Sequence, residues 1–178
     1  MYTCDPNLEL DGFTAMSLVS SVNVKDYFDI LAAHQLDQIV TEGWYPVQEI
    51  LNVFNDIEKR TGAMYDLVSV GMAVAAVKPF PPDKKPTLLQ FLKVYNDRYR
   101  QSHRNGDPGQ IDAQQIGETE FILKVQVPYP DDMMYGLFYG YVRELHPANK
   151  HFIVKYDENH LRKDKGGDMT IFHIQWDK

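Results

Sequence analysis

Apolar residues recur at helical spacing over four segments in the first hundred residues of the chain. This periodicity predicts amphipathic or buried helices. The predicted helices cover residues 24–41, Pro46 to just before Gly62, 64–77, and Thr87 to about Asn105. Thr87 can act as the N-cap of the fourth helix, because its hydroxyl can accept a free backbone N–H of the first turn. The prolines at 79, 81 and 82 are expected to end the third helix, since proline cannot continue one.

The pattern changes to short alternating segments after residue 110. Residues 112–116 and 119–127 are predicted strands of a β-hairpin joined at Gly117 and Glu118. Residues 131–145 return to helical spacing, and residues 150–156 and 168–176 predict a second hairpin around a polar loop. Strands gathered after a helical half favour an α+β fold, with a ββαββ antiparallel sheet following the N-terminal helices. The length of 178 residues fits one domain over 1–178, in which residues 1–22 have no clear pattern.

Aromatic side chains form 12% of the chain and gather on the predicted helix faces at 27–28, 91–99 and 135–141 and on the predicted strands. Two interpretations stay open: a packed aromatic core, or one wall of an apolar pocket in which tyrosine hydroxyls orient a ligand. The small residues Gly136 and Gly140 would allow their helix to approach the sheet closely. The candidate ligand-binding residues are Phe91, Tyr95, Tyr99, Tyr135, Phe138 and Tyr141.

The net charge and the cysteine content limit the expected classes of partner and the expected cellular location. The net charge of -7 argues against nucleic acid and anionic membranes, which attract basic surfaces. No apolar stretch approaches the 18 to 20 residues or so that span a bilayer. Cys4 is the one cysteine and follows no signal-like start, which predicts a reducing, cytoplasmic location. No phosphate-binding, dinucleotide-binding or hydrolase motif occurs, so we do not expect an enzyme.

Two histidines on the last predicted strands are a candidate metal pair. If Tyr156 pairs opposite Asp168, antiparallel pairing also places His151 opposite His173. Their imidazoles could then share a metal, although zinc would need further ligands. The alternative is a pair of half-exposed strand histidines without a metal.

Several residues accompany this order of elements: Gly43, Trp44, Lys59 to Gly62, Gly71, Tyr129, and Ile174 to Trp176. Together with the order of elements, they resemble the ligand-binding superfamily of nitric-oxide signalling and Golgi transport. This superfamily includes haem–nitric-oxide-binding domains, vinyl-4-reductase-type small-molecule domains and subunits of a Golgi tethering complex. The resemblance covers residues 24 to 176.

The resemblance implies tests for a cofactor. Haem-binding members carry a helical proximal histidine before the first hairpin, and a Tyr-x-Ser-x-Arg motif that holds the haem propionates. Here Tyr129 matches the tyrosine, but Asp131 and Met133 stand where the serine and arginine would be. His103 is available near the end of the fourth helix, where it could equally cap that helix. The cysteines that bind metal in vinyl-4-reductase-type members are absent from the second hairpin, so no metal site is carried over and no haem is expected.

These observations lead to three functional hypotheses. The first is a sensory or binding domain without enzymatic activity that holds a small, largely apolar ligand between the helices and the sheet. The second is a protein-interaction module that forms a homodimer through the early helices. The third is a haem-based gas sensor.

Overall fold

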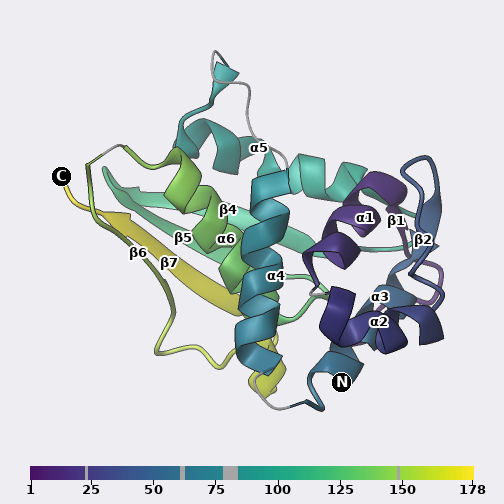
Figure 1. The fold of residues 1–178 in the computed structure, drawn as a ribbon. Coiled ribbons are helices and arrows are strands. Elements are labelled where there is room, and N and C mark those ends of the chain that lie inside the picture. Colours follow the sequence, from purple (N-terminus) through teal and green to yellow (C-terminus); the bar gives the residue numbers. More distant parts are fainter. Residues whose placement is uncertain (23, 61–62, 78–83, 148) are drawn as a thin grey trace.

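The protein has an α+β fold in which six helices and two antiparallel sheets are described (Figure 1). The computed structural model describes the chain apart from residues 23, 61, 62, 78–83 and 148. The helices are α1 (Gly12–Ser21), α2 (Val24–Ala33), α3 (Val47–Ile57), α4 (Ala63–Val77), α5 (Leu88–Gln101) and α6 (Asp131–Leu145). The strands are β1 (Glu9–Asp11), β2 (Trp44–Pro46), β3 (His103–Arg104), β4 (Gln110–Gly117), β5 (Glu120–Gln126), β6 (Phe152–Tyr156) and β7 (Thr170–Trp176).

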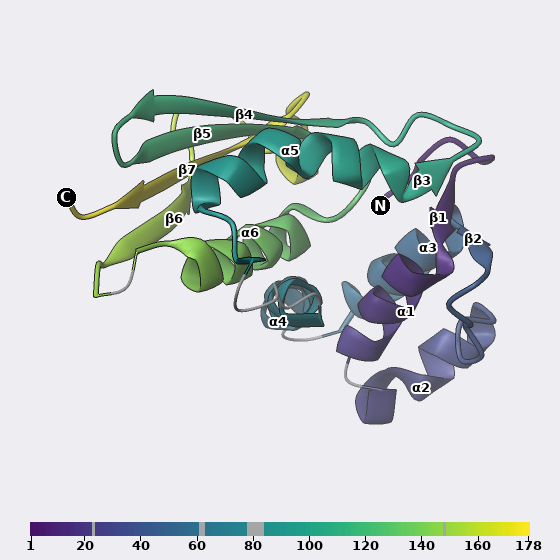
Figure 2. The ribbon, with the colours of Figure 1, turned by 90° about the horizontal axis from the view of Figure 1, so that it is seen from above.

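The four-stranded sheet has the order β4-β5-β7-β6, so the predicted ββαββ arrangement is confirmed. Helices α5 and α6 lie against one face of this sheet, and α1 to α3 lie farther away, beyond α4 (Figure 2). Strand β5 shows how the sequence sets this layering: Phe121, Leu123 and Val125 are buried, while the residues between them are less so. This alternation of period two directs one face of the sheet into the core.

The register of β6 and β7 differs from the prediction. Tyr156 lies opposite Phe172 rather than Asp168, and His173 lies opposite Lys155 rather than His151. The difference lies in the loop before β7, which contains a 3-10 turn at Lys163–Lys165 and extends through residue 169, so that β7 begins at Thr170. The backbone N–H of Lys163 donates to Thr170 Oγ1 at 2.9 Å and holds this loop to the first residue of the strand.

Helices α4 and α6 cross at unusually close range. A Cβ atom added to Gly71 would lie 2.0 Å from the Met133 carbonyl oxygen, and one added to Gly136 would lie 2.0 Å from that of Val68. Backbone therefore meets backbone at this crossing. The sequence correctly indicated a close approach at Gly136 and Gly140, but the partner is α4 and not the sheet.

The N-terminal segment, which had no clear pattern, is ordered structure. Strand β1 pairs with both β2 and β3 in a small second sheet, and Leu10 at its centre is fully buried. Helix α1 follows directly, with the carboxylate of Asp11 accepting the backbone N–H of Thr14 at 2.9 Å. This is an ordinary N-cap, which satisfies one of the free donors of the first turn.

Three helices end before their predicted bounds, and one of them is α3, which ends at Ile57 instead of just before Gly62. The predicted helix over 24–41 ends as α2 at Ala33, since Gln35 takes a left-handed conformation with φ of 57°. The N–H of Leu36 bonds to the Leu31 carbonyl and that of Gln35 to the Ala32 carbonyl, which is a Schellman ending without glycine. Helix α5 ends at Gln101, earlier than predicted, but its predicted cap is confirmed as a full capping box of Thr87 and Gln90.

The predicted effect of the prolines at 79, 81 and 82 falls outside the described residues. Within the described part of the chain, every helix is too short or too polar to cross a membrane.

Candidate functional site

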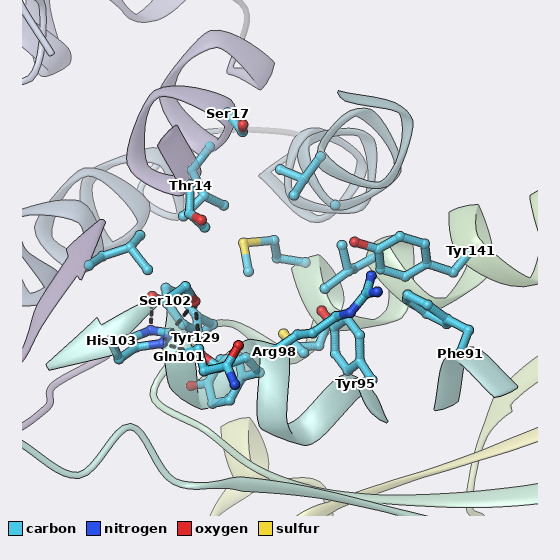
Figure 3. A pocket seen from close by; sticks show the side chains of 18 residues that line it. Thr14, Ser17, Phe91, Tyr95, Arg98, Gln101, Ser102, His103, Tyr129 and Tyr141 are labelled. Carbon is cyan, nitrogen blue, oxygen red and sulfur yellow. Dashed lines mark hydrogen bonds between the residues drawn. The ribbon is translucent and has the colours of Figure 1, made fainter. Parts of the chain in front are cut away.

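A cavity of about 300 Å³ lies among helices α1, α4, α5 and α6 (Figure 3). The sequence predicted a site between the helices and the sheet. The four-stranded sheet does not line the cavity, so the site lies between helices. The lining residues are Leu10, Thr14, Ser17, Leu18, Gly71, Val74, Phe91, Tyr95, Arg98, Tyr99, Gln101, Ser102, His103, Tyr129, Met133, Met134, Leu137 and Tyr141.

The structure brings four of the six predicted ligand-binding residues to this cavity. They are Phe91, Tyr95 and Tyr99 from α5 and Tyr141 from α6. The other two lie elsewhere. Tyr135 stacks on Tyr156 with ring centroids 5.4 Å apart, and Phe138 packs on Phe172 at 5.5 Å, so both rings contact the sheet.

Three rings form a continuous aromatic wall. The Phe91 ring centroid lies 4.5 Å from that of Tyr141 and 5.1 Å from that of Tyr95, and the two tyrosine rings are 5.5 Å apart. Burial raises the pKa of Tyr141 to about 12 and that of Tyr95 well above its ordinary value. Both hydroxyls therefore stay protonated at neutral pH and can donate hydrogen bonds.

The two hydroxyls of this wall also interact with each other. Their hydrogen bond raises the pKa of Tyr95 and lowers that of Tyr141. Both residues line the cavity, and each hydroxyl carries a proton that a ligand could accept.

A buried histidine closes another part of the cavity. Nδ1 of His103 lies 2.7 Å from the Tyr99 carbonyl oxygen, and Nε2 lies 2.8 Å from the Tyr129 hydroxyl. Burial lowers the pKa of His103, which favours the neutral ring. A carbonyl can only accept, so Nδ1 carries the proton and Nε2 accepts from Tyr129. The contact with the last turn of α5 agrees with the capping role that the sequence allowed.

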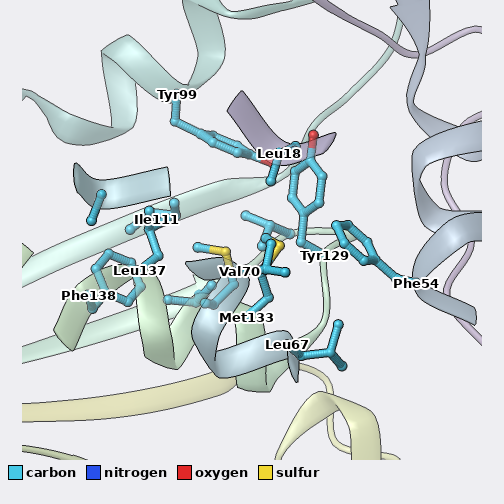
Figure 4. Close-up of a cluster of buried hydrophobic side chains, with 14 of the residues drawn as sticks. Leu18, Phe54, Leu67, Val70, Tyr99, Ile111, Tyr129, Met133, Leu137 and Phe138 are labelled. Carbon is cyan, nitrogen blue, oxygen red and sulfur yellow. The ribbon is translucent and has the colours of Figure 1, made fainter. Parts of the chain in front are cut away.

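Aliphatic side chains fill the rest of the wall and join the main core. Leu18 of α1 and Leu137 of α6 line the cavity and belong to the buried cluster drawn in Figure 4. Met133 and Met134 lie beside them, and thioether side chains adapt readily to differently shaped neighbours. Gly71 contributes backbone only, because α6 lies against it.

The charge of the cavity contrasts with that of the chain. No Asp or Glu occurs among the described lining residues, and Arg98 is the charged side chain there. Arg98 is exposed, makes no hydrogen bond or ion pair with any residue that the structure describes, and extends toward Tyr141 (Figure 3). The cavity is thus apolar inside and cationic at its mouth, in a protein of net charge -7.

Sequence reasoning missed the contribution of the first helix. Thr14, Ser17 and Leu18 line the cavity at positions i, i+3 and i+4 of α1, a spacing that places side chains on one helix face. That spacing could have indicated the helix. Its short length and the weak contrast between its faces concealed it.

The structure does not form the predicted metal pair. His173 Nε2 donates to Asp157 Oδ2 at 2.6 Å, whereas His151 is exposed and precedes β6. The observed register separates them, because His173 lies opposite Lys155. In the part of the chain that the structure describes, no three His, Cys, Asp or Glu side chains form a metal-binding group.

No protein-family profile matches the sequence, and no curated protein sequence matches it. Solved structures of H-NOX proteins do match over nearly the whole chain. An oxygen-binding H-NOX domain related to soluble guanylate cyclases has a TM-score of 0.70 at 16% identity, covering 94% of this chain and 93% of that one. An H-NOX protein from S. oneidensis has a TM-score of 0.69 at 13% identity, covering 95% and 97%. A Cs H-NOX variant has a TM-score of 0.71 at 14% identity, with the same coverage. The chain therefore has the fold of the H-NOX domains, which is the fold that its resemblance to the superfamily of nitric-oxide signalling and Golgi transport implied.

Proposed function

We propose that this protein is a ligand-binding sensory domain that holds a small, largely apolar molecule without haem. The observation that carries the proposal is the cavity of about 300 Å³ among α1, α4, α5 and α6. Pockets for small organic ligands begin at about 300 Å³ and combine apolar walls with a few placed polar groups. The aromatic wall and the Tyr141 hydroxyl supply both features.

The residues present do not fit a haem. The histidine nearest the site, His103, follows α5 instead of lying within it, and its Nε2 lone pair accepts from Tyr129. A metal would have to displace that hydroxyl. The cavity is also small for a macrocycle, because the rings of Phe91, Tyr95 and Tyr141 occupy one of its sides.

The positions expected to hold propionates argue in the same direction. Asp131 is buried and accepts the backbone N–H of Asp164 at 2.9 Å, so it holds the loop before β7. Met133 is an apolar part of the cavity wall. An ionised aspartate and a methionine thioether carry no proton to donate, so neither side chain can donate a hydrogen bond to a propionate. The oxygen binding of the matched H-NOX domain is a property of that protein.

Native mass spectrometry of protein purified without denaturation tests the proposal. We expect a bound small molecule that leaves on unfolding, and a preparation that shows no Soret band after haem is added. Val74→Phe should fill the cavity and abolish ligand binding, because Val74 lines it. Val94→Phe is the matched control, since Val94 is an exposed valine of α5 outside the lining.

Two results would contradict the proposal. If the purified protein carries no ligand and binds none of a panel of small aromatic and aliphatic compounds, the proposed binding function is wrong. If added haem gives a stoichiometric Soret band that is lost in Val74→Phe and kept in Val94→Phe, the cavity binds haem, and the haem-free part of the proposal is wrong. The homodimer and the cytoplasmic location stay predictions, and sedimentation velocity at micromolar concentration tests the former.

A further inference from the structure

The mouth of the cavity carries an unpaired cation that the proposed function leaves unexplained. Arg98 lies on α5 with its guanidinium extended toward Tyr141 (Figure 3). The neighbouring Arg100 shows the usual alternative, because its guanidinium donates to the Gly109 carbonyl at 2.8 Å and lies 3.4 Å from Asp107. Arg98 makes no such contact with a described residue.

The surroundings of Arg98 favour an anionic ligand group. Among the described lining residues no carboxylate competes for the guanidinium, and burial keeps His103 neutral. The Arg98 charge reaches Tyr141, whose pKa it lowers against the larger effect of burial. The Tyr141 hydroxyl keeps its proton, because burial raises its pKa to about 12, so it can donate a hydrogen bond beside the guanidinium that extends toward it (Figure 3).

The interior favours a hydrocarbon body attached to that group. Val74, Met134 and Leu137 face the cavity together with the ring of Phe91. The hydroxyl protons of the polar lining residues on α1 are already used: Thr14 donates to Asp11 Oδ2 at 2.7 Å, and Ser17 donates to the Phe13 carbonyl at 2.8 Å. A ligand with polar groups along its length would therefore find few free donors inside.

We propose that the cavity binds a small apolar carboxylic acid, whose carboxylate receives hydrogen bonds from Arg98 and Tyr141 at the mouth while its hydrocarbon part lies between α1, α4 and α6. This inference rests on the proposed function and names its ligand class. Arginine suits the role, because its planar guanidinium donates two parallel hydrogen bonds to a carboxylate.

Matched pairs of probes test the inference by titration calorimetry at pH 7.5. One pair is octanoic acid and octan-1-ol, and the other is 2-naphthoic acid and 2-naphthylmethanol. Within each pair the hydrocarbon is shared and the carboxylate is present or absent. We expect the acid of at least one pair to bind about tenfold or more tightly than its alcohol, as a charge-assisted hydrogen bond predicts.

Variants locate the effect. Arg98→Gln should reduce the affinity of the acid about tenfold or more and leave that of the alcohol within about twofold, so the preference disappears. Lys93→Gln removes the same charge from an exposed position of α5 outside the cavity and should keep the preference. Tyr141→Phe retains the ring packing on Phe91 and should weaken acid binding several-fold.

The outcomes separate the two proposals. Alcohols that bind as tightly as their acids, or a preference that survives Arg98→Gln, overturn the carboxylate inference while the binding domain stands. Equal losses in Arg98→Gln and Lys93→Gln also overturn it, because the effect would then be long-range charge. If neither acids nor alcohols bind, and native mass spectrometry finds no bound molecule, both proposals fail.

Discussion

At the scale of single residues, the site depends on hydrogen bonds that fix the state of each polar group. His103 is held in one neutral tautomer between the Tyr99 carbonyl and the Tyr129 hydroxyl. The sequence could indicate that His103 meets the end of a helix, because capping is local. It could not indicate Tyr129 as the second partner, since that contact depends on how two segments 26 residues apart fold together.

The lowered pKa of His103 predicts a pH dependence of stability. In the unfolded chain a histidine titrates near pH 6.5, so below that pH the unfolded state binds the proton first. The stability that neutral His103 contributes is therefore present above about pH 6.5 and is lost as pH falls toward the folded-state pKa. Urea unfolding should show a free energy of unfolding that falls between pH 7 and pH 5.5, with at most about 1.4 kcal/mol per pH unit from this group.

The variant His103→Gln isolates this effect. Other titrating groups change equally in both proteins, so the wild type should lose more stability on acidification than the variant does. Asp11 and Arg100 act on the same ring in opposite directions and are unchanged. The same pH dependence in the two proteins would show that His103 does not titrate differently on folding.

At the scale of elements, local signals could be predicted and long-range ones could not. Helix α5 begins where Thr87 predicts, because its capping box lies within four residues. Strand β1 has three residues and pairs with segments near residues 45 and 103, so no local pattern defines it. The end of α2 at Gln35 was missed because a left-handed glutamine replaces the usual glycine signal.

The α4–α6 crossing gives a prediction at this scale. Gly136→Ala would insert a Cβ atom 2.0 Å from the Val68 carbonyl oxygen, so one helix must shift. Alanine usually stabilises a helix relative to glycine, but this gain is smaller than the cost of overpacking the crossing. The free energy of unfolding should therefore fall by about 1–3 kcal/mol. Thermal or urea unfolding measures it.

A substitution on the open side of α4 is the control for this prediction. Ser69→Ala changes an exposed residue next to Val68 and should leave the free energy of unfolding within about 0.5 kcal/mol. A Gly136→Ala protein as stable as wild type would mean that the two backbones do not approach this closely.

At the scale of the whole molecule, the site is assembled from segments that span Leu10 to Tyr141. The aromatic stripe of α5 pointed to its own share of the lining because those residues are close in sequence. Which rings of α6 face the cavity and which face the sheet depends on how that helix is rotated between α4 and β7. The register of β6 and β7 likewise follows from loop contacts to α6, which strand patterns do not contain.

Because several helices line the cavity, ligand binding should reduce hydrogen exchange in each of them. A ligand such as 2-naphthoic acid at a saturating concentration should slow hydrogen exchange in α1 as well as in α5 and α6, because all three contribute walls. Exchange measured by mass spectrometry with and without the acid tests this. Protection confined to α5, with α1 unchanged, would place the ligand on the surface near Arg98 and outside the cavity.

The close α4–α6 crossing also decides where ligand size can be selected. At Gly71 the cavity wall is bare backbone resting on backbone, so no shorter side chain exists that could widen it. The opposite walls carry replaceable side chains, Leu18 and Thr14 on α1 and Phe91 on α5. Relatives or engineered variants that accept longer molecules should therefore differ on α1 and α5, while the glycines of the crossing stay the same.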